Sequence, residues 1–188
     1  RAAGAARVRA QIDGSGAGDE EHRRFLAVLF PRNRLQILAY NRHILLDDSL
    51  VDSMIETLEA RFDLLDENGD GPDSSSGVRG VPRKKAESCV YAHGRWHRYD
   101  MRNKVPAESD DPVSSLDLTV FQKQVLDPVL GPVDQKSDKR FEFIGGLDSE
   151  KKLEAKVTQY GGIAVSLYPV SVDELMDIAD EEQIMEIA

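Results

Sequence analysis

The chain has 188 residues, of which 40% are hydrophobic and 31% are charged, and its formal net charge is −10. This composition suits a globular protein and excludes a wholly disordered one. No apolar run approaches the roughly 18 residues of a membrane-spanning helix, so we expect no membrane partner. No secretory signal is visible at the start, and the single cysteine, Cys89, cannot form an internal disulfide. We therefore expect a cytoplasmic protein.

The first half of the chain combines short apolar runs with one amphipathic helix. Residues 25–30 are continuously apolar and are stopped by Pro31, which predicts a strand paired in a hairpin with residues 35–44. A helix capped by Ser49 is predicted to follow, with an apolar face that extends to Leu65. Residues 66–85 are rich in glycine, serine and charge, which predicts a mobile polar loop.

The second half alternates strand and helix signals. The predicted elements are a hairpin of Glu87–His93 with Trp96–Met101, a helix Ser115–Leu126 ended by Pro128, a strand Phe141–Ile144, a helix Ser149–Tyr160 closed by Gly161, a strand Ile163–Tyr168, and a helix capped by Ser171 and Glu174. These patterns predict a single α+β domain over residues 1–188, with a mainly antiparallel mixed sheet backed by four to five helices.

Charge is distributed unevenly along the chain. Residues 79–104 contain eight basic and two acidic residues, whereas residues 171–188 contain seven acidic residues and no basic one. The basic segment could attract an anionic ligand, or the two segments could neutralise each other, and the sequence leaves both open. The net negative charge argues against nucleic acid as a partner.

Two short motifs are candidates for ligand binding. Residues 66–71, DENGDG, match the first six positions of a calcium-binding loop, but Gly77 stands where the loop needs a bidentate glutamate. The sequence leaves calcium binding by this loop open, and the four histidines have no spacing that predicts a metal site. The second motif, Gly145-Gly146 before a predicted helix, could bind a phosphate with help from Arg140, or could be a plain tight turn.

Several segments together resemble a bacterial family known as domain of unknown function 1015. They include FLAVLFP at 25–31, Tyr40-Asn41-Arg42, Gly94-Arg95-Trp96, DPVSSLD at 111–117, Asp138-Lys139-Arg140, FIGG at 143–146 and Leu167-Tyr168-Pro169. The resemblance covers the chain from Arg24 to its end, apart from the predicted polar loop. Family members look longer on both sides, and upstream they carry an Asp-Gly-His-His-Arg motif of which Arg1 would be the last residue. The resemblance thus implies the C-terminal part of a longer protein, with the missing N-terminal region as its partner.

The upstream motif is similar to one in the ParB and sulfiredoxin-like superfamily, which includes free-serine kinases. By this analogy the longer protein handles a phosphate or nucleotide, with ADP or ATP and magnesium as candidate cofactors and a small phosphorylated metabolite as a candidate ligand. The fragment alone would be inactive. The residues assigned by this resemblance are Arg1 and Asp117 for catalysis, and Asn41, Arg42, Arg140, Gly145 and Gly146 for ligand binding. The alternative is a non-catalytic binding or regulatory module, and the sequence decides neither this nor the oligomeric state.

Overall fold

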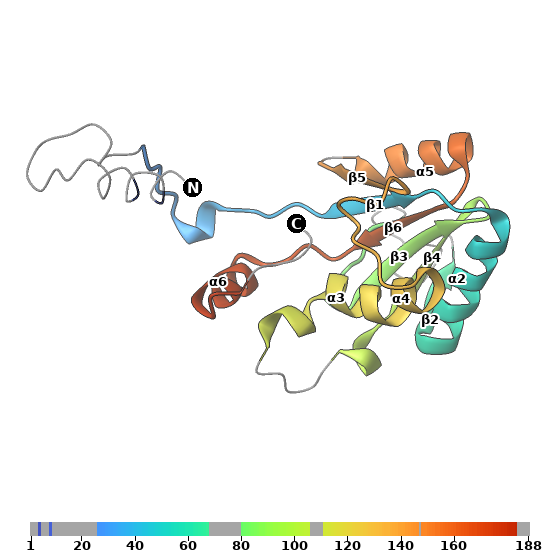
Figure 1. Ribbon diagram of the computed structural model, residues 1–188, viewed down its shortest axis with the longest axis horizontal. Helices are drawn as coiled ribbons and strands as arrows, with labels where there is room; N and C mark the ends of the chain where they lie inside the picture. Colours follow the sequence, from blue (N-terminus) through green and yellow to red (C-terminus); the bar gives the residue numbers. More distant parts are fainter. Residues whose placement is uncertain are drawn as a thin grey trace, which may run out of the picture. The chain divides into compact units, whose positions relative to one another are not determined.

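The structure, a computed structural model, describes residues 4, 8, 26–67, 80–105, 111–146 and 148–183 (Figure 1). Its chain divides into two compact units, residues 1–35 and residues 36–188. In the first unit, η2 (Arg32–Arg34) is a short 3-10 helix, and Leu26–Phe30 are exposed and form no strand. The predicted strand over residues 25–30, and its hairpin with residues 35–44, are therefore wrong. An apolar run becomes a strand only where a neighbour pairs with its backbone, and no described strand does so here.

The second unit is built on a six-stranded sheet in the order β2-β4-β3-β6-β1-β5, in which all neighbours are antiparallel. The strands are β1 (Tyr40–Ile44), β2 (Asp63–Glu67), β3 (Glu87–Ala92), β4 (Arg95–Asp100), β5 (Phe141–Gly145) and β6 (Ile163–Leu167). Helices pack on this sheet, which confirms the predicted α+β class.

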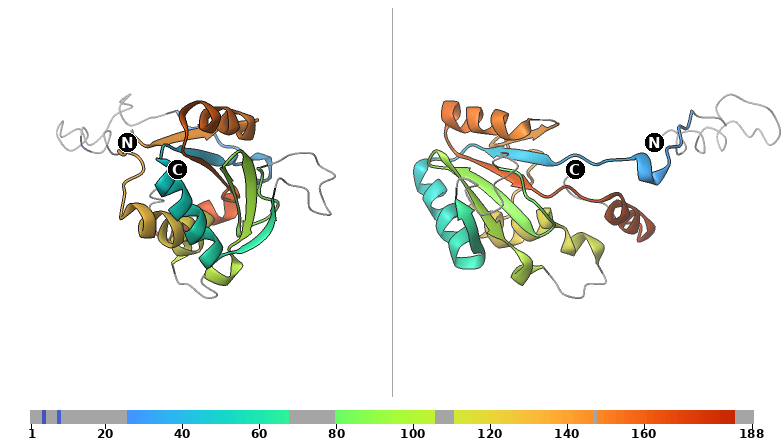
Figure 2. Two further views of the ribbon diagram at one scale, coloured as in Figure 1. Left: turned by 90° about the vertical axis from the view of Figure 1, so that its right-hand side faces the viewer. Right: turned by 180° about the vertical axis from the view of Figure 1, so that it is seen from behind.

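Helices cover both faces of the sheet. The described residues of this unit form the α-helices α2 (Asp48–Arg61), α3 (Asp117–Phe121), α4 (Asp127–Leu130), α5 (Ser149–Tyr160) and α6 (Val172–Asp180). Figures 1 and 2 show α5 on one face and α2 and α4 on the other. The larger core lies on the α2 side and includes Ile44, Met54 and Phe121, whereas a smaller core around Trp96 and Leu153 lies under α5. Because strand side chains alternate between faces, neighbouring residues of β3 belong to different cores, Cys89 to the smaller and Val90 to the larger.

Helix α2 begins one residue before the predicted cap. The side chain of Asp47, and not of Ser49, accepts the backbone N–H of Leu50 at 2.9 Å. The helix ends at Arg61, and Leu65 lies in the edge strand β2 with Asp66. The predicted polar loop therefore begins after β2, and residues 68–79 of it lie outside the described residues.

The predicted hairpin of β3 and β4 is confirmed. Its two-residue turn consists of His93 and Gly94, with φ angles of 50° and 79°. Positive φ at both positions defines a type I′ turn, whose twist matches that of paired strands. This hairpin lies inside the sheet, because β4 also pairs with β2 and β3 also pairs with β6.

A helix that the sequence predicts to stop before Pro128 continues to Leu130 with a change of geometry. Between α3 and α4 lies η6 (Gln122–Leu126), a π-helical segment. Proline lacks an N–H and its ring clashes with the carbonyl four residues earlier in a regular α-helix. The wider π turn that precedes Pro128 changes that hydrogen-bond spacing, so the helix continues.

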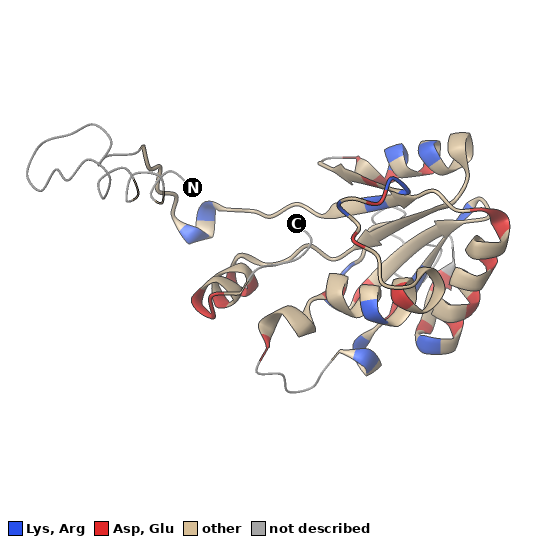
Figure 3. Ribbon diagram, viewed as in Figure 1, with Lys and Arg blue, Asp and Glu red and all other residues tan. Residues whose placement is uncertain are grey.

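The acidic and basic segments are in contact in the second unit. The ammonium group of Lys85 pairs with the carboxylate of Glu174. Glu174 lies on α6, a helix on which Figure 3 marks acidic residues in red. Glu174 is also part of the capping box with Ser171 that the sequence predicts. Other basic groups of residues 79–104 are paired locally, such as Arg102 with Asp100. Neutralisation therefore accounts for part of the uneven charge.

Candidate functional site: an apolar pocket around a buried arginine

A pocket of about 340 Å³ opens beside the start of β1 and the end of β6, where these two strands separate. Its walls come from the segments flanking these strands and from two helices, and they are formed by Ile37, Leu38, Tyr40, Arg42, Leu118, Leu167, Tyr168, Pro169, Val170 and Leu175. Among the described residues of this lining, Arg42 is the one charged residue, and the two tyrosines are the other polar ones. A concave apolar site with very few polar groups is the usual form of a small-molecule site.

Strands β1 and β6 separate at this point while each keeps its other neighbour. Their ladder ends at the Arg42–Val165 pair, beyond which Tyr40 still pairs with β5 and Leu167 with β3. Strand β6 ends at Leu167 and is followed by Pro169, which has no N–H to donate. Two residues later Ser171 caps α6, which carries Leu175 into the pocket wall. The pocket thus lies between the separating ends of β1 and β6.

Arg42 is the residue that gives the pocket its chemistry. Its side chain is 4% exposed, and burial lowers the pKa of the guanidinium to about 10, with a smaller opposing effect from Tyr40. Its Nε donates to Oε1 of Gln135 at 2.7 Å, and Nη1 donates weakly to the Tyr40 carbonyl at 3.5 Å. Among the described residues no carboxylate pairs with it. A buried cation without a counter-ion is costly, so this is an unusual arrangement for a purely structural side chain.

Two stacked aromatic rings lie beside the guanidinium of Arg42. The rings of Tyr40 and Phe143 are stacked with centroids 5.2 Å apart and an interplanar angle of 7°, and Arg42 lies 5.5 Å from the Phe143 centroid. Gly145 faces Tyr40 across the β1–β5 ladder, and a Cβ there would lie 3.1 Å from the tyrosine ring. Gly145 therefore leaves room for this stack.

Behind the pocket, a chain of side-chain amides connects Arg42 to a carboxylate. Gln135, which is 2% exposed, accepts from Arg42 and donates through Nε2 to Oε1 of Gln122. Gln122 in turn donates through Nε2 to Oδ1 of Asp127. Because the arginine can only donate and the carboxylate accepts, the two ends fix the direction of both amides.

Asp117 lies at the start of α3, outside the pocket lining, although its neighbour Leu118 is part of it. It is 5% exposed, and Oδ2 accepts the backbone N–H of Ala86 at 2.8 Å. Oδ1 has no hydrogen-bond partner among the described atoms. Burial raises the pKa of this carboxyl to about 7, against smaller lowering effects of the Ala86 bond and of Lys85.

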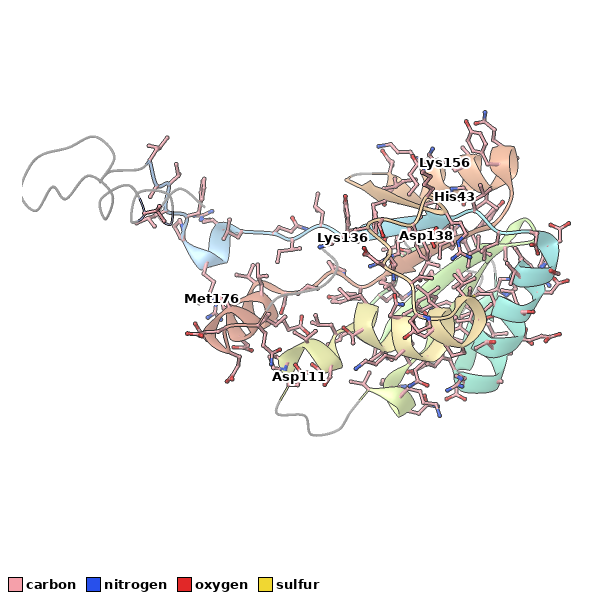
Figure 4. All side chains as sticks on the ribbon, in the orientation of Figure 1. His43, Asp111, Lys136, Asp138, Lys156 and Met176 are labelled. Atoms are coloured by element: carbon pink, nitrogen blue, oxygen red, sulfur yellow. The ribbon has the colours of Figure 1, made fainter. Side chains whose placement is uncertain are left out.

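The other predicted site residues do not gather around Arg42. Asn41 points to the α5 face and donates to Oγ of Ser149 at 2.9 Å. Arg140 pairs with Asp138 at 2.6 Å on the loop before β5, where Figure 4 labels Asp138. Gly146 follows β5 with a φ of 92°, and a Cβ added to it would meet no described atom within 4 Å. Arg1 lies outside the described residues.

The α5 face carries a second polar cluster. Arg98 pairs with Asp66 and lies 4.0 Å from Glu87, and the indole of Trp96 donates to Glu154 at 2.6 Å. The cavity beside this cluster holds about 20 Å³, room for about one water molecule. Burial raises the pKa of the neighbouring Cys89 thiol, so the thiol stays protonated and unreactive. This cluster stabilises the sheet.

Within the described part of the chain, no group of three or more His, Cys, Asp or Glu side chains is placed to hold a metal ion. Asp66, the first residue of the calcium-like motif, is engaged with Arg98, and Asn68, Asp70 and Gly71 fall among the residues that are not described. In the same described ranges, no helix combines the length and apolar character that a membrane crossing demands.

Sequence reasoning missed the two glutamines behind the pocket. Gln135 lies in a loop and Gln122 on a helix, and neither belongs to a motif. One local signal was present for Gln122. Gln122 stands five residues before Asp127, which Pro128 follows directly. The apolar pattern of the helix continues past this proline, which indicates an irregular turn, and that turn brings Gln122 and Asp127 together.

Comparison with known proteins identifies a family and no activity. A family model described as "Protein of unknown function (DUF1015)" matches residues 1–119, which is more than half of the chain. Comparison with the curated proteins and comparison with the solved structures gave no match.

Proposed function

Because this chain belongs to the DUF1015 family, whose function is unknown, we propose its role from the pocket itself: it binds a small organic anion. The anionic group pairs with Arg42 and the apolar body contacts the surrounding walls. The observation that supports this is the buried guanidinium without a carboxylate partner among the described residues, in the wall of an open apolar pocket.

The guanidinium has donors to spare. Its Nε–H donates to Gln135 and one Nη1–H to the Tyr40 carbonyl, and no other described atom accepts from the remaining N–H bonds. A carboxylate or phosphate can take two parallel hydrogen bonds from such a group, which adds geometric specificity to the charge attraction. An incoming anion would also supply the counter-ion that no described residue provides to the buried cation.

The walls define the rest of the ligand. Leu118, Leu167 and Leu175 offer apolar contact, and Tyr40 and Tyr168 add aromatic rings at half-exposed positions. Such walls stabilise an aliphatic or aromatic body by burying its surface. A nucleotide is a poorer fit, because its several phosphate charges would meet one cation.

Phosphotransfer by a longer protein, with a ParB/sulfiredoxin-like upstream region, is the second candidate. The observation that favours it is the same guanidinium, since arginine also binds phosphate oxygens. A cytoplasmic location fits both candidates, because the one cysteine is buried and reduced. The two differ in the ligand that the pocket should accept.

Titration calorimetry with a panel of ligands tests the proposal. Phenylacetate and octanoate should bind, and serine, phosphoserine and magnesium with ADP or ATP should bind more weakly or not at all. Arg42→Met should reduce phenylacetate affinity by about tenfold or more, equivalent to about 1.4 kcal/mol. Arg102→Met is the matched control, since Arg102 is exposed and paired with Asp100.

Failure of both carboxylates to bind would reject the proposal. Binding of ADP or ATP that depends on Arg42 would favour the phosphotransfer candidate instead. Equal affinity of Arg42→Met and the unsubstituted protein for phenylacetate would show that the anion binds elsewhere.

A further inference from the structure

The structure assigns a selectivity role to the amide chain behind Arg42, an inference that rests on the proposed function. We propose that Asp127, acting through Gln122 and Gln135, positions Arg42 and makes the pocket select a monocarboxylate over a phosphate. These three residues are positioning residues, because none of them lines the pocket.

The first step is geometric. The hydrogen bond from Arg42 Nε to Gln135 is 2.7 Å long and buried, so the edge of the guanidinium that contains Nε is occupied. A ligand is left with the two terminal nitrogens. These two nitrogens match the two oxygens of a carboxylate, which can accept from both in parallel.

The second step concerns charge. Gln135 links the positive guanidinium to Gln122, and Gln122 links it to the carboxylate of Asp127. All hydrogen bonds in this chain are donated in the direction from Arg42 to Asp127. The chain therefore links the two opposite charges as an ion pair would, although they do not touch. The pocket thus presents less than one full positive charge, and its remaining walls are apolar. A dianionic phosphate would have to lose its hydration with too little charge to compensate, whereas a monoanion is better matched.

The third step explains why the helix is irregular here. Residues five apart in a regular α-helix are about 140° apart around the axis and do not face each other. In the π-helical segment η6 backbone hydrogen bonds join residues five apart, and the Asp127 N–H donates to the Gln122 carbonyl, so the side chain of Gln122 reaches that of Asp127. The π turn therefore assembles the chain of amides, and such turns recur at functional sites.

Three ligands with the same phenyl group and different head groups test this inference on the full chain. They are phenylacetate, phenyl phosphate and the neutral phenylacetamide, and titration calorimetry above pH 7.5 gives the three affinities. We expect phenylacetate to bind about tenfold tighter than phenyl phosphate, and phenylacetamide to bind weakest.

Two variants of the chain alter the amides without touching the pocket wall. Gln122→Leu breaks the link, and Asp127→Asn removes the charge while keeping an acceptor for Gln122. In both, the ratio of phenylacetate to phenyl phosphate affinity should fall by about fivefold or more. Gln124→Leu is the matched control on the same π-helical segment, because Gln124 instead accepts from Arg61 on α2. General damage to the fold would weaken all three ligands together and leave the ratio unchanged.

An unchanged ratio in both Gln122→Leu and Asp127→Asn would overturn the inference and leave the proposed function standing. Tighter binding of phenyl phosphate than of phenylacetate by the unsubstituted protein would do the same. Absence of binding by all three ligands would instead reject the proposed function, and the inference with it.

Discussion

Arg42 and Asp117 are both buried ionisable side chains, but they differ in how many partners stabilise the charged form. Arg42 keeps hydrogen bonds to Gln135 and to a backbone carbonyl and lies against an aromatic ring, so its burial is partly compensated. Asp117 has one hydrogen bond, from Ala86, and an oxygen with no described partner. Burial therefore disfavours the charged form more effectively at Asp117, and its pKa of about 7 lies in the physiological range.

The raised pKa of Asp117 gives the stability of the fold a defined pH dependence. In the folded chain the carboxyl holds its proton up to about pH 7, whereas an unfolded carboxyl releases it near pH 3.8. Between these values the folded state binds more protons, so stability falls as pH rises, by about 1.4 kcal/mol per unit. The asparagine variant Asp117→Asn has no such proton to lose and should become the more stable protein above pH 7.

Urea unfolding of both proteins between pH 5 and pH 8 measures this difference. Asp177→Asn, which changes an exposed aspartate of α6, should keep the pH profile of the unsubstituted chain. Parallel profiles for Asp117→Asn and the unsubstituted chain would show that Asp117 is ionised in the fold at pH 5.

At the scale of secondary-structure elements, the irregular positions are the ones that shape the pocket. The β1–β6 ladder ends at the Arg42–Val165 pair although β6 continues to Leu167, and the π turn before Pro128 aligns Gln122 with Asp127. Both features interrupt a regular hydrogen-bond pattern. Regular elements such as α2 and α5 supply the packed cores that hold these interruptions in place.

The β3–β4 turn allows a backbone effect to be measured alone. Gly94 has a φ of 79°, and a Cβ added to it would meet no atom within 4 Å. Gly94→Ala should therefore cost about 1 kcal/mol of unfolding free energy from backbone strain, with no contribution from steric overlap. Gly94→Asn should cost less, since asparagine tolerates this conformation better. Equal losses for the two variants in urea unfolding would contradict a backbone origin.

At the scale of the whole molecule, the sequence predicts what is local and misses what is distant. The Ser171–Glu174 cap, the Gly161 helix end and the His93-Gly94 turn each depend on a few adjacent residues, and all three are found. The hydrogen bond of Arg42 to Gln135 joins residues 93 positions apart, and no periodicity predicts it. For the same reason the sequence alone does not distinguish Arg42, which lines a pocket, from Arg140, which pairs with its neighbour Asp138.

The two compact units lead to a prediction about which residues carry the fold. Among the described residues, all six strands and both hydrophobic cores lie after residue 36, and the first core residue is Ile44. Removal of residues 1–35 should therefore leave a chain that unfolds cooperatively, with an unfolding free energy within about 0.5 kcal/mol of the original. It should also bind phenylacetate, because every described residue that lines the pocket is retained.

Urea unfolding and calorimetry on the shortened chain measure both quantities. Leu29→Ser in the full chain is a milder companion variant, because Leu29 is 92% exposed and its replacement should change neither quantity. If the shortened chain loses cooperative unfolding and Leu29→Ser also destabilises the full chain, residues 1–35 contribute to a common core, and the protein is one domain over all 188 residues. If both variants retain stability, the second unit folds on its own and the pocket belongs to it alone.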